Sequence, residues 1–146
     1  ISTWGTSAFW IARLQLLLAY AAAAAHKFMG TSWLDGTAVS LVAADDTFKL
    51  GWLATSPAMC TVLTYATLAF MSLFPVAVWW KPTRRIWLCV GVLFHLSTAV
   101  FMGIPQMAFA FIACYALWLD ESEALAILHR IQGWFSWIGS RALQPV

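Results

Sequence analysis

Charged residues are scarce in this chain. Of its 146 residues, 10% are charged and 62% are hydrophobic, and the mean hydropathy is +0.79. Soluble domains have about 25% charged residues, so the composition excludes a soluble protein and predicts an integral membrane protein. The net charge of +2 is too small for a nucleic-acid partner, because such proteins concentrate positive charge on one surface.

The chain also lacks the common patterns of metal, phosphate and nucleophile sites. Cys60, Cys89 and Cys114 form no CxxC pair and lie in apolar segments, which predicts buried, inert thiols. The three histidines and six carboxylates form no HxxxH or HxxE pair on one helix face, so we predict no metal site. Neither a glycine-rich phosphate loop nor a nucleophile elbow is present.

What the chain has in abundance is long apolar segments, and a helix needs about 20 residues to cross a bilayer core. Four segments fit membrane-spanning helices, the last of them short: 8–28, 58–80, 86–102 and 106–119. The segment 33–44, with Ser32 as its N-cap, predicts a short interfacial helix, and 121–139 predicts an amphipathic helix. The fold class is therefore an all-α, polytopic membrane helix bundle, with residues 1–146 as one domain.

The distribution of basic and aromatic residues predicts an orientation. Lys81, Arg84 and Arg85 follow Trp79 and Trp80 and make the densest basic cluster beside any span. Basic loops face the cytoplasm, so we expect this loop and both chain ends there. The chain begins with Ile rather than Met, and we expect that an N-terminal part precedes it.

A lysine near the end of the first span is the main candidate for a functional residue. Arg13, Tyr20 and Lys27 recur every seven residues, so they form one stripe that drifts by about 20° per heptad. We expect this stripe to face protein or water. Lys27 then has two interpretations: a base or cation that lines a polar pocket, or a side chain that extends its ammonium to the lipid headgroups.

His95 is the second candidate, because it lies near the middle of its span, far from any headgroup. It is either a neutral histidine bonded to a neighbouring helix or a residue that relays protons or binds a quinone. Together, Tyr20, Lys27 and His95 are the residues from which a quinone pocket could be built, with Lys27 and His95 as the catalytic pair.

Four segments resemble a known membrane domain when taken in order. They are RLQLLLAYAAAAAHKF (13–28), SWLDGTAVSLV (32–42), TYATLAFMSLFPVAVWWKPTRR (64–85) and IWLCVGVLFHLSTAVFMGI (86–104). Their order is similar to that of the transmembrane domain shared by vitamin K-dependent gamma-carboxylases and the bacterial HTTM (horizontally transferred transmembrane) proteins. This resemblance implies a bacterial inner (cytoplasmic) membrane. The resemblance covers residues 9–119 and corresponds to the later part of that domain. Its motif positions are occupied here by Lys27, Trp33, Gly36, Phe94, His95 and Gly103.

The resemblance implies a role for Lys27, because it corresponds to the lysine that acts as the base in the carboxylase. Where the carboxylase has two lysines, this chain has His26 and Lys27, and Leu96 and Ser97 follow the Phe-His pair in place of an asparagine. Two functions remain open. The first, which we favour, is a non-catalytic accessory subunit that packs against lipids and other subunits of a membrane complex. The second is a membrane enzyme or quinone-binding subunit that uses Lys27 as base. The sequence assigns no cofactor, and a quinone or a lipid is the candidate.

Overall fold

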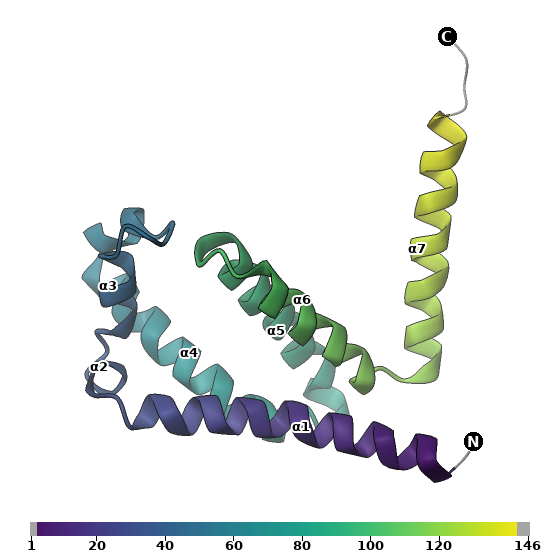
Figure 1. The fold of residues 1–146 in the computed structure, drawn as a ribbon, viewed down its shortest axis with the longest axis horizontal. Coiled ribbons are helices and arrows are strands. Elements are labelled where there is room, and N and C mark those ends of the chain that lie inside the picture. The colour runs from purple at the N-terminus through teal and green to yellow at the C-terminus, as the bar shows by residue number, and fades with distance from the viewer. Residues whose placement is uncertain (1–2, 143–146) are drawn as a thin grey trace.

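The computed structural model describes residues 3–142, and this part of the chain is almost wholly helical and contains no strand (Figure 1). The helices in chain order are α1 (Thr3–Phe28), α2 (Thr31–Leu34), α3 (Ala38–Ala43), the 3₁₀ helix η1 (Gly51–Thr55), α4 (Pro57–Ala77), α5 (Lys81–Phe101), α6 (Pro105–Tyr115), the 3₁₀ helix η2 (Ala116–Trp118) and α7 (Glu121–Ala142).

Three helices of the described chain, α1, α4 and α5, are long and apolar enough to cross a membrane. This confirms the predicted all-α membrane fold. The predicted fourth span is shorter than the others: the apolar stretch Pro105–Trp118 rises only about 20 Å at ~1.5 Å per residue, against a hydrocarbon core of about 30 Å. Its start is set by Gly103, whose φ of +69° ends α5, and by Pro105, which starts the next helix.

The predicted single helix at 33–44 is wrong. The segment folds as two short helices, α2 and α3, because Asp35 accepts hydrogen bonds from the backbone N–H and the hydroxyl of Thr37, at 3.0 and 2.6 Å. Gly36 between them has a φ of +81°. The predicted N-cap, Ser32, is also wrong, since Gly30 holds that position. The broken helix is attached to α4, whose Tyr65 hydroxyl donates to the Leu34 carbonyl at 3.0 Å.

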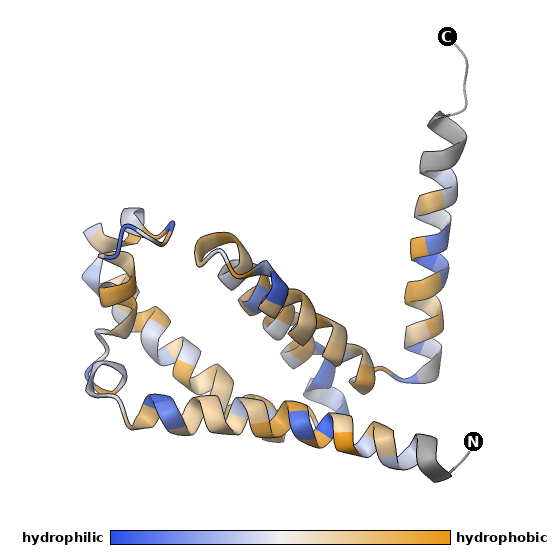
Figure 2. Ribbon diagram, viewed as in Figure 1, coloured by the Kyte–Doolittle hydropathy of each residue, from blue (hydrophilic) through white to orange (hydrophobic). Residues whose placement is uncertain are grey.

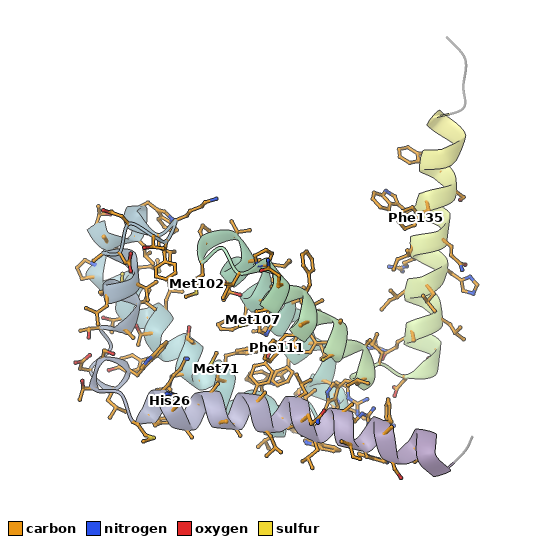
Figure 3. All side chains as sticks on the ribbon, in the orientation of Figure 1. His26, Met71, Met102, Met107, Phe111 and Phe135 are labelled. Atoms are coloured by element: carbon orange, nitrogen blue, oxygen red, sulfur yellow. The ribbon has the colours of Figure 1, made fainter. Side chains whose placement is uncertain are left out.

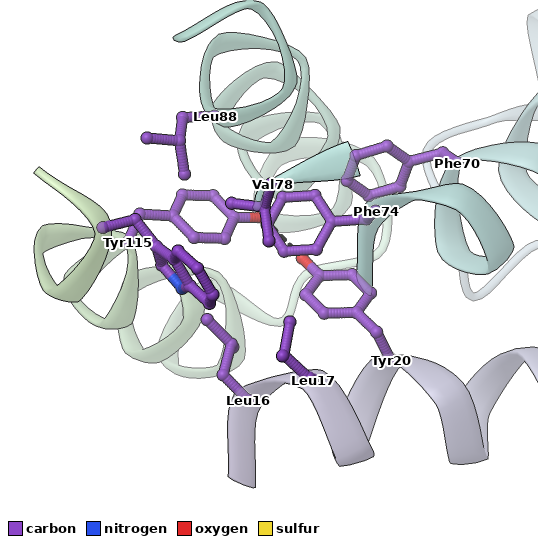
Figure 4. Packing of buried hydrophobic residues seen from close by; sticks show 9 residues of the cluster. Leu16, Leu17, Tyr20, Phe70, Phe74, Val78, Leu88 and Tyr115 are labelled. Carbon is purple, nitrogen blue, oxygen red and sulfur yellow. Dashed lines mark hydrogen bonds between the residues drawn. The ribbon is translucent and has the colours of Figure 1, made fainter. Parts of the chain in front are cut away.

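Two pairs of helices enclose the core. α1 crosses α4, and α5 runs beside α6 (Figure 1). Where the two pairs meet, side chains from α1, α4, α5, α6 and η2 form the main apolar cluster (Figure 4). Its buried members are Leu16, Leu17, Tyr20, Phe70, Phe74, Val78, Leu88, Tyr115 and Trp118. A smaller cluster of Ala43, Leu53 and Cys60 holds α3 and η1 against the start of α4.

Two arginines close the bundle at the end of η2. Arg13 of α1 donates from Nε and Nη2 to the Leu117 carbonyl, at 2.8 and 2.6 Å, and its guanidinium carbon lies 4.7 Å from the Trp118 ring centroid. Arg84 of α5 donates to the Trp118 carbonyl at 3.4 Å. The last carbonyls of a helix carry its negative dipole end, so both cations satisfy groups that would otherwise be unpaired in an apolar setting.

The last helix, α7, leaves the bundle at this same end (Figure 1). Its first turn is attached by Glu123, which accepts from Arg85 Nε at 2.5 Å and from the Asp120 backbone N–H at 3.0 Å. The hydrogen bond from the Asp120 backbone has the larger effect and the one from Arg85 the next, and both hold the pKa of Glu123 below its ordinary value. Every residue from Leu125 to Trp137 is exposed, and Figure 2 shows both hydrophobic and hydrophilic residues along the helix. The predicted helix at 121–139 is thus present and extends to Ala142.

Candidate functional site

Tyr20 stands at the centre of the core and carries two hydrogen bonds. Its hydroxyl lies 2.6 Å from His95 Nε2 of α5 and is also bonded to the hydroxyl of Tyr115 of α6 (Figure 4). The three residues are 2%, 2% and 4% exposed, in the order Tyr20, His95 and Tyr115. They therefore form a buried polar network that joins three helices, which we call the Tyr20–His95–Tyr115 network.

Aromatic side chains fix the position of this network. The His95 ring stacks on Phe111 with centroids 4.6 Å apart, and the Tyr20 ring lies 4.4 Å from the Phe74 ring, centroid to centroid. Gly91, one turn before His95, allows the Tyr115 ring to lie directly on α5. A Cβ at Gly91 would be 2.7 Å from Tyr115 Cζ, closer than real contacts allow.

The network has more donors than bonds. A neutral histidine supplies one N–H and each tyrosine one O–H, whereas only two hydrogen bonds join the three groups. His95 Nδ1 is buried without a partner in the described chain. Whether the two hydrogen bonds run from His95 toward Tyr115 or from Tyr115 toward His95, one N–H or O–H therefore remains without an acceptor. Such an arrangement can pass a proton between His95 and Tyr115, or donate to an oxygen of a bound group.

Lys27 lies apart from this network. It is seven residues beyond Tyr20 on α1, which is about 10 Å along the helix axis. Its ammonium nitrogen lies 4.6 Å from the centroid of the Trp33 ring of α2. The surface hollow that includes Lys27 contains neither Tyr20 nor His95. The fold thus brings together Tyr20 and His95 and places Lys27 at a different part of the molecule.

The stripe of Arg13, Tyr20 and Lys27 does face protein, as predicted. Arg13 contacts η2, Tyr20 contacts α5 and α6, and Lys27 contacts α2. Tyr115 was not among the residues predicted for the site. The signal for Tyr115 in the sequence is weak. It consists of Gly91, a small residue that lies one turn before His95 on α5, the helix that Tyr115 packs against.

The described residues contain no group of three or more His, Cys, Asp or Glu side chains that could hold a metal ion. The cysteines are free; Cys60 is buried, but Cys89 is exposed and Cys114 half-buried. The prediction that all three thiols are buried is therefore wrong for Cys89, which lies on an outer face of α5.

With this geometry established, comparison with known proteins identifies the domain. The family model of the HTTM domain matches residues 1–122. The chain belongs to the HTTM domain family. No match was found among curated proteins or among solved structures. The HTTM domain therefore includes the Tyr20–His95–Tyr115 network and Lys27, whereas all of α7 after its first two residues follows the matched segment.

Proposed function

We propose that this HTTM protein is a non-catalytic accessory subunit that packs against another integral membrane protein. The observation that carries the proposal is an exposed face of small residues on α1. Ala21, Ala22 and Ala25 are exposed, and Ala21 and Ala25 are one turn apart on the same face.

This face continues toward the N-terminus with larger side chains. Ile11, Leu14 and Leu18 are 57%, 56% and 57% exposed, and they share the same side of the helix as the alanines. The inward face of α1 is occupied by the stripe of Arg13, Tyr20 and Lys27. The outward face is therefore available along the whole span.

Small residues on such a face favour a protein neighbour over lipid. Lipid tails are as apolar as leucine, so helices associate in a bilayer through close packing, which small residues permit. The spanning helices also leave most of their surface uncovered: only 22%, 28% and 17% of the most apolar stretches of α1, α4 and α5 are buried. A helix of a partner protein that packs across Ala21 and Ala25 would cover part of this surface, and lipids would cover the rest.

The proposed location is a bacterial inner membrane with both chain ends in the cytoplasm. Lys81, Arg84 and Arg85 support this orientation through the positive-inside rule. Trp10 of α1 stacks on Trp79 beside this basic cluster, with centroids 6.0 Å apart, so the start of α1 shares its end of the bundle. α7 also begins there. Lys27 and α2 then belong to the opposite, outer side.

The alternative is a membrane enzyme or quinone-binding subunit, supported by the donor that the Tyr20–His95–Tyr115 network leaves unused. Carboxylase-like chemistry would require Lys27 as base close to the bound quinone. Because Lys27 lies on a separate hollow with Trp33, we prefer the accessory function.

Purification from native membranes in mild detergent tests the proposal. Ala21→Leu together with Ala25→Leu fills the small-residue face, and Ala66→Leu together with Ala69→Leu is the matched control on an exposed face of α4. We expect one partner protein to copurify at constant stoichiometry with wild type and with the α4 control, and to be lost from the α1 variant. Equal retention in both variants contradicts the proposal, as does recovery of an isolated chain with bound quinone.

A further inference from the structure

A surface hollow lies where α1 ends and α2 begins. It has a volume of about 450 Å³ and is lined by Ala23, His26, Lys27, Gly30, Ser32 and Trp33. Figure 3 labels His26 on α1 close to this turn. The hollow is distinct from the alanine face of the proposed function, because Ala21, Ala22 and Ala25 do not line it.

The hollow carries positive charge without a compensating carboxylate. Lys27 is half-buried, and its ammonium is held over the Trp33 ring. The ion pairs of the described residues are Arg84–Asp120 and Arg85–Glu123, so Lys27 has no acidic partner among them. No Asp or Glu lines the hollow.

Two further side chains supply hydrogen-bond donors. His26 carries an imidazole N–H and Ser32 a hydroxyl, and both line the hollow together with Lys27. Ammonium, imidazole and hydroxyl groups that converge on one space are suited to the oxygens of a phosphate group, since hydrogen bonds from charged donors to anionic oxygens are the stronger kind. Trp33 forms an apolar wall beside them.

The position of the hollow points to the source of the phosphate. Lys27 is in the last turn of a helix that can cross the membrane. The end of such a helix lies at the depth of the lipid headgroups. Phe28 and Leu34 nearby are 48% and 55% exposed, so acyl chains can pack beside the hollow. We propose that the hollow binds the phosphate of an anionic membrane lipid. Lys27 is the cation that contacts the phosphate, and Trp33 is the wall that holds the Lys27 ammonium in place.

The test uses the full chain in detergent, titrated with phosphatidylglycerol and followed by native mass spectrometry. Lys27→Met keeps an unbranched side chain over Trp33 and removes the charge. Loss of one charge-assisted hydrogen bond weakens binding about tenfold or more. Lys49→Met is the matched control, because Lys49 is exposed and does not line the hollow. Lys27→Arg restores the charge, and circular dichroism checks that each variant is folded.

We expect saturable binding of one phosphatidylglycerol, at least about tenfold weaker in Lys27→Met and nearly unchanged in Lys49→Met and Lys27→Arg. Equal binding by Lys27→Met and wild type overturns the proposal, and so does an equal loss in the Lys49→Met control. Inorganic phosphate is the second probe. If it displaces the lipid at micromolar concentration, the site serves a free phosphate and the assignment to a lipid is wrong.

Discussion

Substituting Gly91 with alanine tests the packing of the Tyr20–His95–Tyr115 network directly. The new Cβ would lie 2.7 and 2.8 Å from Cζ and Cε2 of Tyr115, and it would also come against the hydroxyl. Tyr115 is 4% exposed and is surrounded by Phe74 and His95. Its ring cannot move without breaking the hydrogen bond to Tyr20.

The magnitude follows from three contributions. Overpacking in a core costs about 1–3 kcal/mol, and the lost hydrogen bond costs about 1 kcal/mol. The better helix propensity of alanine offsets about 1 kcal/mol. Gly91→Ala should therefore destabilise the fold by about 1–3 kcal/mol and lower the thermal midpoint in detergent by on the order of 5 °C.

Gly133→Ala is the matched control, because Gly133 lies inside α7 and its Cβ would meet nothing within 4 Å. The same substitution there should not lower the midpoint. In a Tyr115→Ala background the ring is absent, so Gly91→Ala should cost nothing and the two changes should be strongly non-additive. An unchanged midpoint for Gly91→Ala, or full additivity with Tyr115→Ala, would refute the packing of Tyr115 on Gly91.

Two further predictions concern the network and the attachment of α7. Tyr20→Phe removes both hydrogen bonds and leaves His95 and Tyr115 buried without partners, so it should cost about 1–3 kcal/mol in detergent-unfolding experiments; a neutral result would contradict the network. The hydrogen bonds to Glu123 hold its pKa below the ordinary 4.5, so the Glu123–Arg85 bridge contributes at neutral pH and is lost as pH falls through the lowered pKa. The bridge is exposed, so its contribution is under about 1 kcal/mol. Its loss in acid should broaden the distance distribution between spin labels on α5 and α7. Glu123→Gln should show the broad distribution at every pH.

The apolar segments and the heptad stripe were sufficient to predict much of this fold from sequence. Their lengths gave the spanning helices α1, α4 and α5, because a bilayer imposes a minimum length on an apolar helix. The spacing of Arg13, Tyr20 and Lys27 gave the inward face of α1. Both features depend on local periodicity, which a single sequence displays.

The pairing of side chains between helices could not be predicted in the same way. Tyr20 and His95 were proposed for one site, and they do meet, but Tyr115 joins them only because α6 packs closely on Gly91. Lys27 shares the stripe with Tyr20, yet the turn after Phe28 brings Trp33 beneath its ammonium. Such contacts depend on crossing angles and on the path of the chain between helices, and sequence spacing does not encode either directly.

The break between α2 and α3 shows a different limit. Apolar residues recur through 33–44, which favours a continuous helix. Asp35 instead bonds to Thr37, and Gly36 adopts a left-handed conformation against Thr61 and Tyr65 of α4. The sequence Asp-Gly-Thr is a turn signal, so the break could have been predicted from turn chemistry given more weight than periodicity.

The most direct test of the proposed accessory function is photo-crosslinking in native membranes, with a crosslinking amino acid at Ala21 and, as control, at Ala66 on the exposed face of α4. We expect a single adduct with one other membrane protein from position 21 and only lipid adducts from position 66. Lipid adducts alone from both positions, or an adduct between two copies of this chain at position 21, would contradict it.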